Sequence, residues 1–494
     1  MKTKLLYILR TWPVYLILLP LFFVWHGYVE NRHLVTLDEA GSLLLIYCGS
    51  AIVLFMLCRL FIRNNQKAGI AAFILLFFQF FFGAIHDALK QILPGSFITK
   101  YSFILPLLFV FIIGVFLFLK KTNKQLNRFI LYLNAVLLIL ILTDTVMFIS
   151  QKSQKETTAL PGINELKKCD TCSKPDIYLI VADGYPGKQQ LKDLFDFDNS
   201  PFEKELKKRN FHVVDSSTSN YNFTMFSVAS TLNMDYLAGI KGRNSDKHNI
   251  SVCFSTIKNS QTLSYLEKNG YELINGSMFG FKHQPAAINP TFIPAFVNPI
   301  VSQTLLYRIK RDLSYHLATT LKLKSVLKKW RTADLHNNKK IEELTRRIPE
   351  TTSSSPRFIY SHFVMPHWPY YYDSTGKETH YTRLTEEYAF NTGAFISYLK
   401  YANKMYLALI DHILSVSKKP PVIIFMSDHG FREMSEPVAE KYQFMNLNAV
   451  YLPSGDYSGF YSGQSNVNQF RILFNKLFHQ KLPLLKDSLQ VIID

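Results

Sequence analysis

The chain has 494 residues, of which 48% are hydrophobic and 19% are charged, and its formal net charge is +18. Its long apolar runs are confined to the first 150 residues, which excludes a chain made only of soluble domains. The excess of positive charge favours anionic partners, such as lipid head groups or other phosphorylated polymers.

Five apolar runs are predicted to cross a membrane as helices. They are 12–28, 42–62, 69–88, 102–119 and 129–149. Each is long enough to cross a hydrocarbon core of roughly 30 Å as a helix. The first run is the weakest, because Pro13 and Pro20 interrupt it. It does not read as a signal peptide, because no small-residue cleavage site follows it and further apolar runs come after it.

The basic residues of the short connections predict how these spans are oriented. They cluster before the first span (Lys2, Lys4, Arg10), between the second and third (Arg59, Arg63, Lys67) and between the fourth and fifth (Lys120, Lys121, Lys124, Arg128). All three clusters fall on one side, which predicts a cytoplasmic N-terminus. The membrane is expected to be a bacterial cytoplasmic (inner) membrane. The chain after residue 150 is then periplasmic or extracellular, where we do not expect nucleic acid as a partner.

The membrane region holds few ionisable groups that would suit transport. Asp144 lies in the fifth predicted span, and His86 and Asp87 lie at the end of the third. Each sits within about two turns of the outer boundary, where water reaches. We therefore expect no transport role.

Residues 151–174 are predicted to be a linker and residues 175–494 one α/β doubly wound domain. Predicted strands are 175–182, 211–214, 271–275, 357–363, 421–427 and 448–452; predicted helices are 188–209, 224–238, 259–269 and 392–416. The continuous apolar runs IYLIVA and VIIFMS are typical of buried parallel strands. Cys169 and Cys172 precede this domain, and a small structural disulfide is favoured over a redox role.

A basic stretch, residues 305–347, interrupts the alternation of strands and helices. Leucines alternate there with lysines and arginines at partly helical spacing. Such a stretch is compatible with a helix on a membrane surface and equally with a solvated helical insertion packed on the sheet.

Short polar motifs close two of the predicted strands, and a hydroxyl residue opens one of the predicted helices. Asp183 ends PDIYLIVADGY, Asp428 and His429 end PVIIFMSDHGF, and Thr224 opens the helical stretch TMFSVAS. Such groups at the carboxyl ends of parallel strands meet at one edge of a sheet. Asp183, Asp428 and His429 offer two oxygen ligands and one nitrogen ligand, which suits Zn²⁺ or Mn²⁺.

Thr224 is the candidate nucleophile. Its hydroxyl becomes reactive when a divalent cation stabilises the alkoxide, so we expect it to be a metal ligand as well. The helix N-terminus also favours developing negative charge. Ser227 on the same helix is the rival. His362 and His367, in RFIYSHFVMPHWPY, are expected either to ligate a second metal or to hold a phosphate oxygen and protonate the leaving group.

In the order and combination of these motifs, the chain resembles the alkaline phosphatase/sulfatase superfamily. Within it, the chain looks like the five-span membrane enzymes that include lipoteichoic acid synthases and phosphoethanolamine transferases. The resemblance implies that Asp183, Thr224, Asp428 and His429 bind the metal, that Thr224 is the covalent nucleophile, and that His362 and His367 contact substrate or a second metal.

Three departures from the family pattern restrict this resemblance. TMFSVAS lacks the Pro and Arg of the sulfatase C/S-x-P-x-R motif, which argues against sulfate-ester hydrolysis. Asp183 stands where the lipid-dependent transferases usually have Glu. No further His follows soon after Gly430. One metal ion is therefore favoured over two.

The sequence thus predicts a metal-dependent transferase of the cell envelope. It would move a phosphorylated head group, such as phosphoethanolamine or glycerophosphate, from a membrane phospholipid to an envelope glycan or lipid through a Thr224 intermediate. Two alternatives remain at this point, a phosphodiesterase or phosphatase of the same superfamily and a catalytically silent envelope scaffold.

Overall fold

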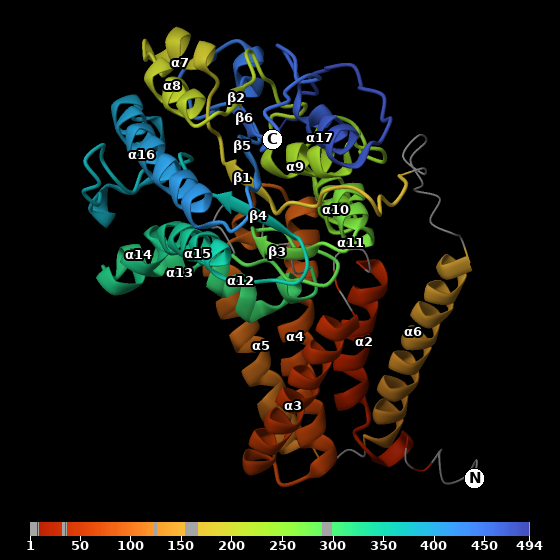
Figure 1. Cartoon of the computed structure of the whole chain (residues 1–494). Coiled ribbons are helices and arrows are strands. Elements are labelled where there is room, and N and C mark those ends of the chain that lie inside the picture. Colours follow the sequence, from red (N-terminus) through yellow and green to blue (C-terminus); the bar gives the residue numbers. More distant parts are fainter. Residues whose placement is uncertain are drawn as a thin grey trace. The chain divides into compact units, whose positions relative to one another are not determined.

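The computed structural model describes residues 7, 9–31, 35, 37–122, 126–153, 166–288 and 299–493. The chain forms two compact units, shown in Figure 1. The first contains Met1–Thr157 and Pro294–Lys322, and the second contains Thr158–Ile293 and Leu323–Asp494. The chain therefore returns to the first unit after leaving it. Residues 299–322, the described part of that return, are called the inserted segment below.

The first unit is built from long apolar helices. They are α2 (Tyr15–Glu30), α3 (Leu37–Phe61), α4 (Asn65–Ile92), α5 (Tyr101–Lys121) and α6 (Asn127–Ser153). The last four are long and apolar enough to cross a membrane, which confirms four of the predicted spans. The first predicted span folds as a shorter helix of 16 residues with Pro20 inside it. Five crossings therefore stay a prediction.

In the first unit, α2 packs against α3, α4 and α6, and α5 packs against α4. Phe23 of α2 stacks on Phe80 of α4 with ring centroids 4.7 Å apart. On α4, the side chain of the N-cap residue Asn64 accepts hydrogen bonds from the backbone N–H groups of Gln66 and Lys67, which fixes where the helix begins.

The second unit contains one six-stranded sheet. Its strands are β1 (Ile177–Ala182), β2 (His212–Val213), β3 (Glu272–Gly276), β4 (Arg357–Phe363), β5 (Val422–Met426) and β6 (Asn448–Tyr451), in the order β2-β6-β5-β1-β4-β3. β1 pairs in parallel with β4 and β5, and β3 pairs in parallel with β4. β6 pairs antiparallel with β5 on one side and with β2 on the other. The predicted doubly wound domain is thus confirmed at the coarser level of a mixed α/β sheet.

Two groups of helices accompany this sheet. One contains α9 (Thr224–Asn233), α10 (Lys247–Lys258), α11 (Gln261–Lys268) and α17 (Gln469–Phe478); the other contains α8 (Ser200–Lys208), α15 (Ala333–Arg347) and α16 (Thr392–Val416). Figure 1 shows them on opposite sides of the strands. Every residue of β1, β4 and β5 is buried, as expected for central strands covered on both faces.

All six predicted strands are confirmed to within two residues at each end. The predicted helix 188–209 is wrong as one helix, because the chain forms α7 (Lys188–Phe195) and then α8. Asp196 between them adopts a left-handed conformation (φ 46°), which a continuous helix does not allow. α9 also ends early, at Met234, which is left-handed (φ 56°).

The basic stretch 305–347 divides between the two units. Its first part forms α12 (Leu305–Asp312) and α13 (Ser314–Thr320) of the inserted segment, where α12 packs on α4. Its second part forms α14 (Lys324–Arg331) and α15, and α15 packs on β3 and β4. An insertion packed on the sheet therefore describes only the second part.

Cys169 and Cys172 form a disulfide, as the sequence favoured. Of the predicted linker 151–174, residues 154–165 lie outside the described part of the chain.

Candidate active site

The register of the sheet brings three predicted site residues to one edge and one face. Val181 of β1 is paired with His362 of β4 and with Met426 of β5. Side chains two residues apart on a strand point to the same face. Asp183 and Asp428, each two residues beyond this row, therefore continue on the face that carries His362.

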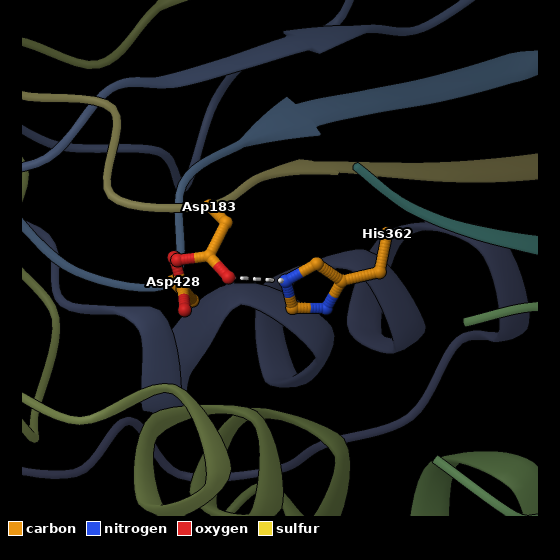
Figure 2. Close-up of side chains that lie close together, drawn as sticks. All are labelled: Asp183, His362 and Asp428. Atoms are coloured by element: carbon orange, nitrogen blue, oxygen red, sulfur yellow. Dashed lines mark ion pairs between the residues drawn. The ribbon is translucent and has the colours of Figure 1, made fainter. Parts of the chain in front are cut away.

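Figure 2 shows the side chains of Asp183, His362 and Asp428 pointing toward one another. One ligand atom from each lies within 4.8 Å of the others. His362 Nε2 is 3.7 Å from Asp183 Oδ2. All three residues are buried, with exposed fractions of 0–2%.

Thr224 and His429 complete this cluster. Thr224 is the first residue of α9, and Val228 and Thr231 of that helix line one small cavity together with Val181 and Asp428. The Thr224 hydroxyl lies 3.2 Å from His429 Nε2. His429 Nε2 in turn lies 3.7 Å from Asp183 Oδ1 and 3.5 Å from Asp428 Oδ2. The four predicted metal ligands are therefore brought together.

Backbone carbonyls set which imidazole nitrogens are available. His429 Nδ1 donates to the Gly430 carbonyl oxygen at 2.7 Å, and His367 Nδ1 donates to the Trp368 carbonyl oxygen at 2.6 Å. In each ring the Nε2 atom is left to face the site. Such a bond on the far nitrogen orients a histidine for metal binding or proton transfer.

Several buried polar atoms of the cluster have no hydrogen-bond partner among the described residues. These atoms are the two carboxylate oxygens of Asp183, the Oδ2 atom of Asp428 and the Nε2 atom of His362. Asp428 Oδ1, by contrast, accepts from the Gly184 backbone N–H at 3.0 Å. Buried carboxylates without partners are costly unless a cation or donor satisfies them. These convergent oxygen and nitrogen atoms fit a divalent metal ion, with His362 as a donor in addition to the predicted set.

The rival nucleophile Ser227 already has a structural bond. Its hydroxyl donates to the Asp428 backbone carbonyl at 2.6 Å. Ser227 therefore holds the loop that carries Asp428 and His429, while Thr224 directs its hydroxyl toward the buried imidazole.

His367 lies beside the cluster and is paired with Glu433, a residue that the sequence reasoning missed. His367 Nε2 is 3.3 Å from Glu433 Oε1. Burial alone would lower the pKa of His367, but the carboxylates of Asp183 and Glu433 outweigh it and raise that pKa to about 10. Burial alone would raise the pKa of Glu433, and His367 instead holds it well below its usual range.

Burial and the neighbouring imidazoles act in opposite directions on the pKa of Asp183. Burial alone would raise the pKa of its carboxyl, but the imidazoles of His367 and His362 lower that pKa below its usual value. Asp183 is therefore ionised, as a metal ligand must be.

Glu433 does not stand out in the sequence, because the family pattern places a histidine after Gly430 and not an acidic residue. The available signal was an acidic residue five positions after Asp428. Arg432, next to it, was also missed: its guanidinium lies 4.0 Å from the centre of the Phe223 ring, immediately before Thr224 in the chain. No described residue accepts a hydrogen bond from this guanidinium, and its Nε atom is buried without a partner.

Exposure rises across the site. The side chains of Asp183 and His362 are 0% exposed, whereas those of His367 and Glu433 are 13% and 19% exposed. The site is therefore most open on the side of His367 and Glu433.

No protein-family model matches the sequence, and no curated protein matches it. Solved structures do match. The C-terminal periplasmic domain of EcEptC from Escherichia coli is 13% identical, with a TM-score of 0.37, over 63% of this chain and 84% of that chain. That of phosphoethanolamine transferase EptC from Campylobacter jejuni is 15% identical, with a TM-score of 0.35, over 64% of this chain and 92% of that chain.

A third match extends over both units. The integral membrane protein lipooligosaccharide phosphoethanolamine transferase A from Neisseria meningitidis is 11% identical, with a TM-score of 0.36, over 95% of each chain. These neighbours include phosphoethanolamine transferases, a group that the sequence resembles. At these identities and TM-scores, the matches carry no argument about the reaction of this protein.

Proposed function

We propose that this protein is a membrane-anchored, metal-dependent phosphotransferase. In this proposal, a phosphorylated head group moves from a membrane phospholipid to Thr224 and then to an envelope glycan or lipid. The observation that carries the proposal is the group of buried, unpartnered oxygen and nitrogen atoms next to the Thr224 hydroxyl. A silent scaffold would gain nothing from burying carboxylates without partners.

The metal would be held by Asp183, Asp428, His429 and Thr224, with His362 as a further donor. A bound Zn²⁺ or Mn²⁺ supplies positive charge that favours the alkoxide form of a hydroxyl and offsets charge on a phosphoryl group. Both carboxylates suit this role, because each has at least one oxygen free of protein donors. We propose one ion, because His367 is paired with Glu433.

In the first step, a bond forms between Thr224 Oγ and phosphorus, and the bond from phosphorus to the diacylglycerol oxygen breaks. The Thr224 hydroxyl proton is lost, and the diacylglycerol oxygen gains a proton. His367 is the proposed donor of that proton, because its Nε2 lies at the more exposed side of the site, where a large leaving group can depart. In the second step, a bond forms between the acceptor oxygen and phosphorus, and the bond from phosphorus to Thr224 Oγ breaks. The acceptor's hydroxyl proton passes to His367, which restores its charged form, and Thr224 Oγ regains from water the proton that it lost in the first step.

Arg432 is proposed to bind the phosphoryl oxygens. Its guanidinium stacks on an aromatic ring, its Nε atom is buried without a hydrogen-bond partner, and the acidic group among the described residues that acts on it is the carboxylate of the neighbouring Glu433. Arginine binds phosphate through two parallel N–H groups, and stacking on Phe223 leaves the edge of the guanidinium free for this.

The proposal is tested with the full-length protein in lipid. Wild type, Thr224→Ala and Thr224→Ser are incubated with phospholipids that carry a labelled head-group phosphate and are quenched in acid. Intact mass is expected to show an adduct on wild type and none on Thr224→Ala, while metal content stays the same within about twofold because two carboxylates and His429 remain.

The same labelled reaction separates transfer from hydrolysis. Label on a glycan or lipid acceptor supports the transferase, and label in a water-soluble alcohol supports the hydrolase. An adduct that persists in Thr224→Ala would contradict the assigned nucleophile. Wild-type protein that contains no metal and forms no adduct would contradict the proposal that this protein is an enzyme.

A further inference from the structure

The inserted segment is anchored in the apolar core of the first unit. Ile300 is 1% exposed and belongs to the hydrophobic cluster of the membrane helices. A Cβ atom on Gly27 of α2 would lie 2.7 Å from Ile300 Cγ1, and one on Gly83 of α4 would lie 2.8 Å from Gln303 Cα. Glycine at these two positions is therefore what allows the segment to approach both helices closely.

Charged and polar groups then fix α12 on the ends of two membrane helices. Arg308 is buried, and its guanidinium donates to both carboxylate oxygens of Asp87 on α4, at 2.8 and 2.7 Å. The Tyr101 hydroxyl on α5 donates to the Asp312 carboxylate. α12 is thus attached at its middle and at its C-terminal end, which sets its orientation on the bundle.

These attachments place α12 at the level of a membrane boundary. About 20 helical residues cross the hydrocarbon core. α4 begins at Asn65, and its last charged residue before the apolar run is Lys67. A span that starts just after Lys67 reaches its far boundary close to Asp87, the residue that holds Arg308. Figure 1 shows α12 beside the corresponding ends of α4 and α5.

The face of the inserted segment that does not pack on the bundle is apolar and basic. Leu306, Leu317 and Leu321 are 68%, 50% and 62% exposed. Lys310 and Lys322 are also exposed, and no described residue pairs with their ammonium groups. Leu306 and Lys310 are one helical turn apart, so they share a face, opposite the buried Arg308. Leucines with lysines beside them suit a boundary where acyl chains meet phosphates.

We propose that the inserted segment lies in the head-group region of the bilayer and binds anionic phospholipid. Leu306, Leu317 and Leu321 reach the acyl chains, while Lys310 and Lys322 reach the phosphates. The level of α12 and the unpaired cations favour lipid over a protein partner. This inference does not depend on the proposed reaction, because it concerns only the first unit.

The proposal is tested by measuring which medium surrounds these leucines. Cys48, Cys58 and Cys253 are replaced by Ala in the full-length protein, and single cysteines are introduced by Leu306→Cys or Leu317→Cys and labelled with bimane. The protein is placed in vesicles of phosphatidylethanolamine and phosphatidylglycerol. Fluorescence is quenched either by iodide in the water or by phospholipids with a doxyl group near the head of the acyl chain.

Two matched positions calibrate the result. Leu107→Cys, at an exposed site on the membrane helix α5, reports lipid, and Ser454→Cys, at an exposed site of the second unit, reports water. We expect Leu306→Cys and Leu317→Cys to match Leu107→Cys in doxyl quenching, within about twofold. Iodide quenching like that of Ser454→Cys would overturn the proposal. Protection from both quenchers would also overturn it, because the leucines would then be covered by protein.

A separate measurement tests whether the inserted segment prefers anionic phospholipid to neutral phospholipid. Quenching of bimane at residue 306 is compared for doxyl-labelled phosphatidylglycerol and doxyl-labelled phosphatidylcholine. We expect the phosphatidylglycerol probe to quench about two- to fivefold more efficiently, and Lys310→Gln with Lys322→Gln to remove the difference. Equal quenching by both probes in the parent protein would overturn the assignment of anionic lipid.

Discussion

Asp87 and Asp183 are acidic residues that lie close to the end of an apolar helix and just after an apolar strand. They differ in whether the fold provides a hydrogen-bond partner for the carboxylate. Asp87, near the end of α4, is held by both guanidinium nitrogens of Arg308. Both oxygens of Asp183, after β1, are buried without a hydrogen-bond partner among the described residues. A carboxylate that the fold satisfies has a structural role, whereas one that the fold leaves unsatisfied is available to bind the metal ion that we propose.

The same distinction separates the other buried acids. Asp144 on α6 lies 3.2 Å from His26 on α2, so this carboxylate also has a protein partner. Asp428 has one oxygen bound by a backbone N–H and the other without a partner, which orients the carboxylate and leaves a free ligand atom. Being paired or unpaired, rather than being buried, therefore distinguishes the candidate site from the polar groups of the membrane helices.

The largest expected effect comes from neutralising an unpaired acid. Asp428→Asn keeps the shape of the side chain and the acceptor for Gly184 but removes the charge that a metal requires. We expect metal content to be lost and transferase activity to fall by at least ~100-fold. Elemental analysis and labelled-lipid turnover measure these effects.

The thermal unfolding temperature serves as the control for Asp428→Asn. It should not fall in metal-free protein, since an uncompensated buried charge has been removed. Metal retained at the wild-type level would contradict the ligand role of Asp428.

Breaking the satisfied pair should give a different kind of effect. Arg308→Met removes the two guanidinium hydrogen bonds to the Asp87 carboxylate, and we expect a loss of about 1–3 kcal/mol in stability, since Asp87 is partly exposed. Metal content should be unchanged. Thermal unfolding in lipid or detergent measures this loss.

The double variant Arg308→Met with Asp87→Asn tests whether the loss of stability comes from the negative charge of Asp87. It should recover much of the loss. If it is as unstable as Arg308→Met, the cost comes from packing and not from the charge.

Glu433 is the intermediate case, because it is paired but lies within the site. Glu433→Gln removes the charge facing His367, and we expect turnover to fall about 10-fold with metal content unchanged. Glu433→Asp, which keeps the charge, should retain more activity. Loss of a metal ion from Glu433→Gln would show instead that His367 and Glu433 hold a second ion.

The smallest effect is expected at Ser227. Ser227→Ala loses one hydrogen bond to the Asp428 carbonyl, worth about 1 kcal/mol of stability, and should keep turnover within about 10-fold of wild type. The mass adduct on the protein should persist. If the adduct disappears in Ser227→Ala and remains in Thr224→Ala, the two hydroxyls have exchanged roles.

Motif spacing predicted much of the second unit. Apolar runs ending in Asp183 and Asp428 are short, continuous and bounded by polar residues, so both the strands and the edge where they meet could be predicted. Period-2 alternation then explains why His362 lies on the same face, although its position beside the two carboxylates became clear only from the register with Val181. Glu433 follows no such period, because it lies in irregular backbone after Gly430.

The division of the basic stretch could not be predicted from its composition. Arg308 and Lys328 look alike in the sequence, but only Arg308 finds a carboxylate on a membrane helix. That partner, Asp87, is 221 residues away in sequence, and local periodicity contains no information on such a contact. The failure of one long helix over 188–209 has a different, local origin, since a single left-handed residue at Asp196 ends α7.

The return of the chain to the membrane helices affects how the protein can be shortened. Removing residues 1–157 to obtain a soluble catalytic protein would leave residues 294–322 in place while deleting α2 and α4, against which Ile300 and Arg308 are buried. Such a fragment would carry an orphaned apolar and basic strip that promotes aggregation. A soluble version is better made by also replacing residues 294–322 with a short flexible linker.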